Sequence, residues 1–328
     1  MFTLLLHLLG WVGLAAASLV ILLVLAWGAG ALYFDLPVKK LFRVVAVLLW
    51  VAGWFLAFYL LPDRPIAFLI GCAVYLGLVI WWSTLKPSLH RDWKPEVAVI
   101  PYAEVEGDVV TVHNVRNFVY RSRDDFTPRY ETRRFSLPNL RGIDVFFNYW
   151  TSRLMAHPIV SFDFGEEGRI AFSIEIRTER GEKYSPWAGL YRQFELILIA
   201  ADEQDIVKVR TNFRDEEVYL YRMTTPRDQA RRRFLEYVDH MNQLYAKADW
   251  YNAITENCTT SIHKHYDPRR RGAWDWRIIV NGFADKMLYD RGGLDTRLPF
   301  EELRRRSQVN ERAKAIGNGM DFSIWIRE

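Results

Sequence analysis

Cys258 and His157 are the residues of this chain whose types and order could perform covalent chemistry. Cys258 is the only cysteine outside the apolar N-terminal third, and it follows Asn257 in the polar stretch Thr255-Glu256-Asn257-Cys258-Thr259-Thr260. A thiol needs a base to become a thiolate, and an imidazole is the usual base. His157 opens a strand-like run well before the cysteine. The pair therefore favours an enzyme with a thiol nucleophile.

The neighbours of Cys258 suit that role. Asn257 can cap a helix that continues through Ile262 and His265. A cysteine in the first helical turn faces the positive end of the helix dipole, which lowers the pKa of a thiol. Backbone N–H groups near Thr259 could then hold an oxyanion. The alternative is that Cys258 is buried as a small hydrophobic residue, and the local sequence alone does not distinguish the two.

A predicted β-hairpin would bring Glu175 beside His157. The turn Gly165-Glu166-Glu167-Gly168 separates the strand candidates Pro158–Phe164 and Ile170–Arg177. With the turn centred between its two glutamates, His157 opposes Ile176, and Glu175 is next to it. Glu175 could orient the imidazole and stabilise its cation. The alternatives are that Glu175 lies on a solvated strand face or that it pairs with Arg177.

The register of this hairpin decides which side chain meets the histidine. A shift of one residue would change which of Ser173, Glu175 or Arg177 shares the face of His157.

Three apolar runs precede the polar part of the chain. They extend from Phe2 to Phe34, from Val44 to Leu61 and from Ile66 to Trp82. Each approaches or exceeds the roughly 20 apolar residues of a membrane span, and aromatic residues end the first and third. The alternative for the second and third runs is a buried hairpin in a soluble protein. No cleavage site follows the first run, so we expect it to be retained.

Charge and length predict two parts, a membrane anchor over residues 1–90 and a second domain over 91–328. Nearly all of the 43 basic and 39 acidic residues follow residue 84, and the formal net charge is +4. Such a mild, dispersed excess does not indicate a nucleic-acid partner. Basic residues in the first connector and after the third run favour a cytoplasmic location for the domain. With Cys72 and Cys258 far apart in the sequence, we expect no internal disulfide.

The second domain reads as α+β with an antiparallel sheet, because strands come first and helices follow. Gly107-Asp108 predicts a hairpin turn, and Phe234, Tyr237, Val238, Met241 and Leu244 have helical spacing. The strand candidates are 97–105, 109–115, 158–164, 170–177, 194–201 and 218–223, and the helix candidates begin at 225, at Cys258, at 278 and at 301, the last running to 316.

Several polar stretches of this domain resemble one known family, the Lnb N-terminal periplasmic domain. The matching stretches are Val112–Phe118, Asp125–Arg133, His157–Phe164, Ser173–Arg177, Ala201–Glu203, Arg210–Asn212, Asn257–Thr260 and Trp274–Arg277. That family is similar to circularly permuted NlpC-type, papain-like folds. There a strand histidine precedes an Asn-Cys that opens a helix, and a third polar residue follows on the next strand. His157, Glu175 and Asn257-Cys258 match this order.

The resemblance implies an activity and a location. It implies an acyl-thioester on Cys258, a phospholipid as acyl donor and a lipoprotein or other amine as acceptor, without a cofactor. It also implies a bacterial inner-membrane protein whose domain faces the periplasm, and we follow it over the weak charge pattern. Two other functions stay open: a papain-like cysteine hydrolase of amide bonds, such as a cell-wall peptidase, and a non-catalytic binding domain.

Basic residues raise two further possibilities. Arg116, Arg129 and Arg177 could bind a lipid phosphate, although ion pairs with nearby acidic residues are the favoured interpretation for the first two. The triplets 231–233, 269–271 and 304–306 could contact anionic headgroups, but such runs are more often solvated helix faces. His263 and His265 have no zinc-site spacing, so we predict no metal.

Overall fold

The computed structural model describes residues 2–150, 152–253, 275–317 and 319–328. The chain divides into two compact units. The membrane unit comprises residues 1–87 together with 184–194, and the sheet domain comprises 88–183 together with 195–328. The packing of residues 184–194 with the apolar helices is not predicted by the sequence.

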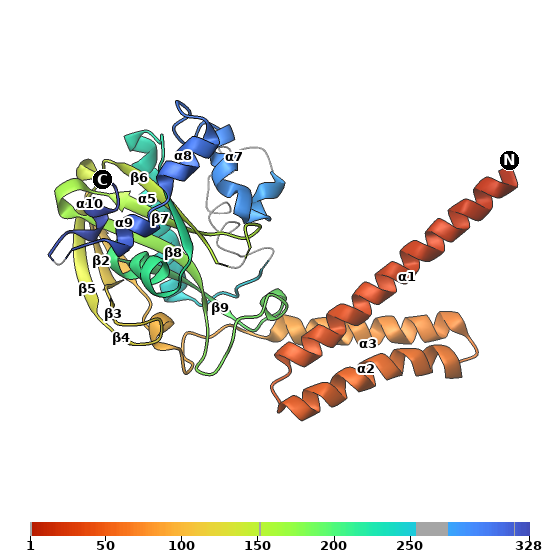
Figure 1. The fold of residues 1–328 in the computed structure, drawn as a ribbon. Coiled ribbons are helices and arrows are strands. Elements are labelled where there is room, and N and C mark those ends of the chain that lie inside the picture. Colours follow the sequence, from red (N-terminus) through yellow and green to blue (C-terminus); the bar gives the residue numbers. More distant parts are fainter. Residues whose placement is uncertain (1, 151, 254–274, 318) are drawn as a thin grey trace. The chain divides into compact units, whose positions relative to one another are not determined.

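Three helices form the membrane unit: α1 (Phe2–Asp35), α2 (Lys40–Leu60) and α3 (Arg64–Thr84) (Figure 1). All three are long and apolar enough to cross a membrane, by length and composition. Trp50 and Trp54 of α2 are buried between the helices, where Gly28 of α1 and Gly71 of α3 leave room for their rings. The outward-facing leucines, valines and isoleucines of these helices are exposed, as expected for contact with lipid.

Residues 184–194 are held against the helix ends by a polar cluster. The guanidinium of Arg192 lies over the ring of Trp82 and donates to the carbonyls of Trp82 and Leu85, at 2.6 and 2.7 Å. Asp35 accepts from the Trp82 indole at 2.6 Å and from the Arg192 backbone at 3.3 Å. Tyr191 stacks on a ring of α1. The contacts of Tyr191 and Arg192 link positions more than 100 residues apart, so local sequence patterns do not reveal them.

The second unit is a mixed, mainly antiparallel sheet with helices, which confirms the predicted α+β class. Its strands run in the order β1-β2-β9-β8-β7-β6-β10, and β5 also pairs with β2. Among the strands that the structure describes, only β2 and β9 pair in parallel, at Arg116 and Ala201. The strands are β1 (Tyr102–Glu106), β2 (Val109–Arg116), β5 (Tyr130–Ser136), β6 (Gly142–Tyr149), β7 (His157–Asp163), β8 (Arg169–Arg177), β9 (Glu195–Ala201) and β10 (Glu217–Arg222), beside a separate pair, β3 (Val119–Tyr120) and β4 (Phe126–Thr127).

Four of the described strands, β3, β4, β5 and β6, were not predicted. All eight residues of β6 are buried, because helices or loops cover both sheet faces there. A strand buried on both faces shows no alternation of polar and apolar residues, so its sequence lacks the usual signal. The predicted hairpin at Gly107 is present, with this glycine at φ +61°.

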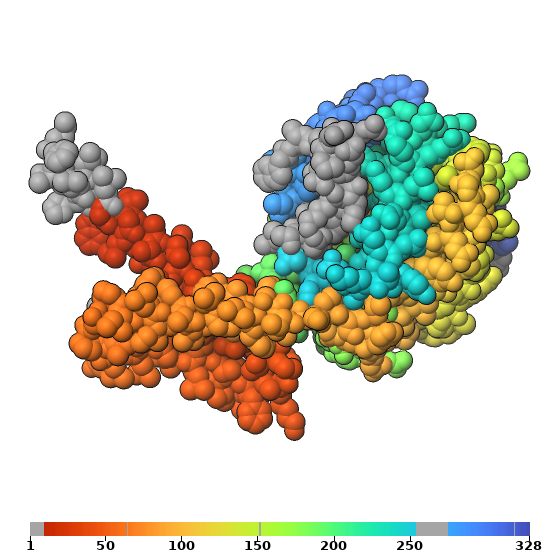
Figure 2. Space-filling view, turned by 180° about the vertical axis from the view of Figure 1, so that it is seen from behind, coloured from red at the N-terminus to blue at the C-terminus, as the bar shows by residue number. Residues whose placement is uncertain are grey.

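Helices cover both faces of the sheet. Helix α5 (Arg227–Ala246) packs Phe234, Val238, Met241 and Leu244 on one face, as its spacing predicted. Figure 2 shows α5, in cyan, across this face beside the strands in orange and yellow. The C-terminal helices α8 (Phe300–Ser307), α9 (Asn310–Lys314) and α10 (Phe322–Trp325) lie on the opposite side (Figure 1). The other helical segments among the described residues are α4 (Glu203–Ile206), α7 (Ala284–Asp290), a π-helical turn at Val209–Phe213, and 3-10 turns at Pro95–Val97, Leu137–Asn139, Gly165–Glu167, Ala188–Leu190, Trp276–Ile278 and Asn281–Phe283.

The prediction of one helix over residues 301–316 is wrong. The segment is divided into α8 and α9, because Gln308 pairs with Tyr219 as an isolated β-bridge and Val309 donates its N–H to the carbonyl of Val218 at 3.0 Å. These tertiary hydrogen bonds to β10 replace the helical ones at the break.

Candidate functional site

His157 begins β7 and is buried against β8. Its Nε2 lies 2.6 Å from the Ser173 hydroxyl and 3.1 Å from Oε1 of Glu175. The β7–β8 ladder pairs Val160 with Phe172 and Ser161 with Ala171, and the same register continued places Glu175 opposite His157. The sequence predicts Ile176 opposite His157, so the predicted register is wrong by one residue.

The turn explains the shift. The N–H of Phe164 donates to the carbonyl of Gly168 at 3.0 Å, which centres the turn on Glu166. Gly165 and Gly168 adopt φ angles of +67° and +88°, which glycine adopts readily. The turn therefore has one central residue, Glu166, instead of the two central residues assumed from the sequence. As a result, each residue of β7 faces a residue of β8 one position earlier than predicted.

The hydrogen bonds around Ser173 define the state of the imidazole. The Ser173 hydroxyl donates to Oε1 of Glu175 at 2.7 Å, so its oxygen can only accept from His157. Nε2 therefore carries a hydrogen, and in the neutral imidazole the basic lone pair lies on Nδ1. In this tautomer the protonated nitrogen faces the carboxylate, as it does in a catalytic triad.

Arg210 fixes the carboxylate that holds the histidine. It lies in the turn Val209–Phe213, is buried, and donates to Glu175 at 2.8 Å and to Glu216 at 3.0 Å. Burial would raise the pKa of Glu175, but the charges of His157 and Arg210 and the hydrogen bonds of His157 and Ser173 hold this pKa well below its usual value. Glu175 is therefore an ionised carboxylate at neutral pH, able to stabilise an imidazolium.

Two asparagines position the backbone around His157. Asn148 of β6 donates to the His157 carbonyl at 2.8 Å, and Asn281 accepts from the Ala156 N–H at 2.9 Å. Neither these two asparagines nor Arg210 is among the site residues predicted from the sequence. The stretch Arg210-Thr211-Asn212 had contributed to the family resemblance, and that was the available signal for Arg210.

The three arginines predicted as possible ligands of a lipid phosphate all contact other groups of the protein. Arg116 forms a two-pronged pair with Asp205, at 2.8 and 2.9 Å, and is buried. Arg177 donates to the carbonyls of Leu89, Val97 and Ala98 and lies over a tryptophan ring. Burial lowers the pKa of Arg177 to about 10. Arg129 pairs with Glu131 at 2.6 Å at an exposed position.

The predicted nucleophile and its neighbours lie outside the described residues. This holds for Cys258, Asn257 and Thr259, and also for His263 and His265. In the part of the chain that the structure describes, no group of three or more His, Cys, Asp or Glu side chains could hold a metal ion.

Glu195 is a second unusual carboxyl group, at the start of β9. Its side chain is 1% exposed, pairs with Arg91 at 2.8 Å and accepts from the Ser88 N–H at 3.0 Å. Burial raises the pKa of Glu195 to about 7, although the Ser88 hydrogen bond and the Arg91 charge oppose this. The carboxyl thus ties the start of the domain, residues 88–91, to a central strand.

This raised pKa predicts a loss of stability with rising pH. A group whose folded-state pKa is raised contributes full stability below its unfolded pKa, and that contribution is lost as pH rises through the folded value. We expect roughly 3 kcal/mol to be lost between pH 4.5 and about 7. Thermal unfolding of Glu195→Gln should lack this component, whereas Glu179→Gln, which removes the other partner of Arg91, should retain it. Parallel pH profiles for all three proteins would contradict the assignment.

Residues 126–282 match the family model of the Lnb N-terminal periplasmic domain. No curated protein and no solved structure matches the chain. The matched range includes His157, Ser173, Glu175, Arg210 and Cys258. A periplasmic-type domain joined to three candidate spans confirms the predicted membrane location and supports the periplasmic side over the weak charge pattern.

Proposed function

We propose that this chain is a membrane-anchored thiol acyltransferase, in which Cys258 takes an acyl group from a phospholipid and passes it to an amine, as in lipoprotein N-acylation. The observation that carries the proposal is the contact of 3.1 Å between His157 Nε2 and the ionised Glu175. A buried imidazole held in one tautomer by a carboxylate is the arrangement that activates a nucleophile. In this chain the matching nucleophile is Cys258, in the Asn-Cys of the same family range.

The first half-reaction makes the acyl-enzyme. Nδ1 of His157 takes the Cys258 proton, and the thiolate attacks the ester carbonyl of the lipid. Backbone N–H groups near Thr259 hold the oxyanion. The C–O bond then breaks, and His157 donates its proton to the departing lysophospholipid oxygen. Glu175 stabilises the imidazolium that exists between these two proton transfers.

The second half-reaction transfers the acyl group. An amine attacks the thioester carbonyl and gives a proton to His157, and the C–S bond breaks to leave an amide and the Cys258 thiolate. With water as the acceptor, the same steps yield a fatty acid. The three candidate spans support a lipid donor, because an anchored domain meets bilayer lipids at a high effective concentration.

Mass spectrometry of the intact protein tests the proposal. After incubation with phospholipid in detergent, wild type should gain one acyl mass that hydroxylamine removes, whereas Cys258→Ala and His157→Ala should gain none. Cys72→Ser removes the other cysteine, exposed on α3, and should acylate normally. An adduct that persists in Cys258→Ala would refute the assigned nucleophile. No adduct in any sample, with Cys258 still open to alkylation, would favour the amide hydrolase instead.

A further inference from the structure

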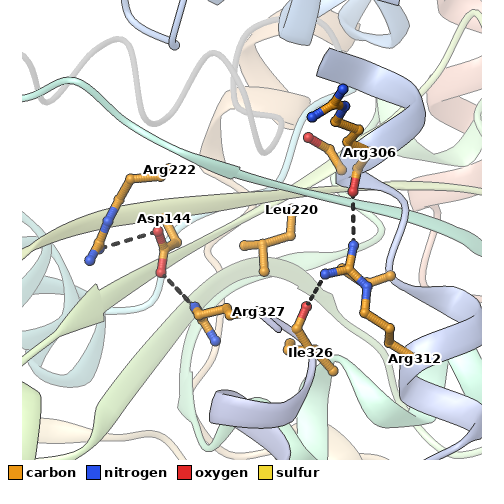
Figure 3. Close-up of a pocket in the computed structure, with 9 residues that line it drawn as sticks. Asp144, Leu220, Arg222, Arg306, Arg312, Ile326 and Arg327 are labelled. Atoms are coloured by element: carbon orange, nitrogen blue, oxygen red, sulfur yellow. Dashed lines mark hydrogen bonds and ion pairs between the residues drawn. The ribbon is translucent and has the colours of Figure 1, made fainter. Parts of the chain in front are cut away.

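A cavity rich in arginine lies at the edge of the sheet, apart from the His157 site. It has a volume of about 300 Å³ and is lined by Asp144, Leu220, Arg222, Arg306, Ser307, Val309, Arg312, Ile326 and Arg327. Figure 3 shows Asp144 between Arg222 and Arg327 at one side, and the backbone carbonyl of Arg306 next to the Arg312 guanidinium at the other. Asp144 is four residues before Asn148, which is paired with His157. At roughly 3.3 Å per residue this separates the two sites by about 13 Å along the strand.

The single carboxylate of the cavity is already neutralised. Asp144 accepts from Arg327 at 2.7 Å and from Arg222 at 3.2 Å. Each of these arginines also pairs with a carboxylate outside the lining, Arg327 with Glu203 at 2.7 Å and Arg222 with Asp163 at 2.8 Å. This side of the cavity is therefore a fixed, charge-balanced wall that has no carboxylate left for a cation.

The other side carries positive charge with little compensation. Arg312 donates to three backbone carbonyls, those of Ile326, Arg306 and Gln308, at 2.8 to 3.2 Å. Among the described residues, no carboxylate forms an ion pair with it. Arg306 pairs with Glu302 at 2.6 Å, but its side chain is 64% exposed. Such a surface pair is weak, so the Arg306 guanidinium can turn towards a ligand at little cost.

The cavity also offers an apolar surface, from Leu220, Val309 and Ile326, and the hydroxyl group of Ser307. Guanidinium groups bind phosphate oxygens through paired, charge-assisted hydrogen bonds. An apolar wall beside them suits a short carbon chain attached to that phosphate. The combination does not suit a metal ion, because four of the nine lining residues are cationic.

We infer that this cavity binds a phosphate ester of glycerol size, with its phosphate at Arg306 and Arg312 and its carbons on Leu220, Val309 and Ile326. Two sources carry this chemistry, a soluble glycerol phosphate and the headgroup of an anionic glycerophospholipid. The inference is independent of Cys258 and His157, since it uses none of their contacts.

The neighbouring residues Arg306 and Arg305 provide a matched pair of variants. Both are exposed, and both pair with Glu302, Arg305 at 2.5 Å and Arg306 at 2.6 Å. Only Arg306 lines the cavity. Arg306→Gln and Arg305→Gln therefore remove the same charge from the same helix and loosen the same carboxylate, but only the first changes the proposed site.

Titration of the full-length protein in detergent with sn-glycerol 3-phosphate, followed by calorimetry, tests the first source. Native mass spectrometry with short-chain phosphatidylglycerol tests the second. We expect binding in at least one experiment, weakened about 10-fold by Arg306→Gln and changed less than about twofold by Arg305→Gln. Whichever probe shows this pattern identifies the source. No binding of either probe, or equal weakening by both variants, would overturn the inference.

Discussion

Glu175→Gln is expected to slow formation of the acyl-enzyme by about 100-fold or more, the scale of an assisted proton transfer. Glutamine is close in size to glutamate, so the hairpin should keep its register. It cannot supply the negative charge that stabilises the imidazolium, and its amide can donate as well as accept towards Nε2. The measurement is the rate of acyl-mass gain under single-turnover conditions, in wild type and variant at the same pH.

Glu216→Gln is the matched control for this prediction. Glu216 and Glu175 both pair with the buried Arg210, at 3.0 and 2.8 Å, but only Glu175 reaches His157. The acid limb of the pH–rate profile should move to lower pH in Glu175→Gln and stay in place in Glu216→Gln, because only the first variant removes a charge beside the imidazolium. Equal slowing with unmoved profiles would reduce Glu175 to a structural partner of Arg210.

The largest stability effect is expected for Phe234→Ala, with a loss of about 3 to 5 kcal/mol in the free energy of unfolding. Phe234 is fully buried, and four phenylalanine rings surround it with centroids 5.0 to 6.4 Å away: Phe135, Phe162, Phe164 and Phe172. Removing the ring leaves a cavity between α5 and the sheet that rigid aromatic neighbours cannot fill.

Chemical unfolding of the full-length protein in detergent, followed by near-ultraviolet circular dichroism, would report this loss. Arg232→Ala lies on the same helix at an exposed position and should change stability by less than about 0.5 kcal/mol. If Phe234→Ala unfolded at the same denaturant concentration as Arg232→Ala, the contacts of α5 with the sheet would not be the main source of stability of this core.

Buried ion pairs are a recurring feature of the sheet domain. Arg116–Asp205, Arg210–Glu175 and Arg327–Glu203 each join a guanidinium to a carboxylate that is mostly or wholly buried. Such pairs add little net stability compared with apolar residues, but breaking one is costly. They favour one arrangement of strands and loops. In the pair Arg210–Glu175, the same arrangement also holds the carboxylate of Glu175 next to His157.

Sequence patterns determined the parts of this protein that depend on local periodicity. The three apolar runs, the α5 face and the β7–β8 hairpin could all be predicted, because solvent or lipid imposes a regular spacing on residues that face it. The polar order His157, Glu175, Asn257-Cys258 likewise predicts a thiol site from the sequence alone.

Only the tertiary structure decided the contacts that join distant segments. The one-residue register of the hairpin depends on a hydrogen bond inside the turn, and Arg210 reaches Glu175 from 35 positions away in the sequence. The arginine cavity and the packing of residues 184–194 on the membrane helices likewise join segments with no common local pattern. Local sequence determines whether a residue lies on a buried or an exposed face of its helix or strand. The residue that it contacts from a distant segment depends on the tertiary fold of the whole chain.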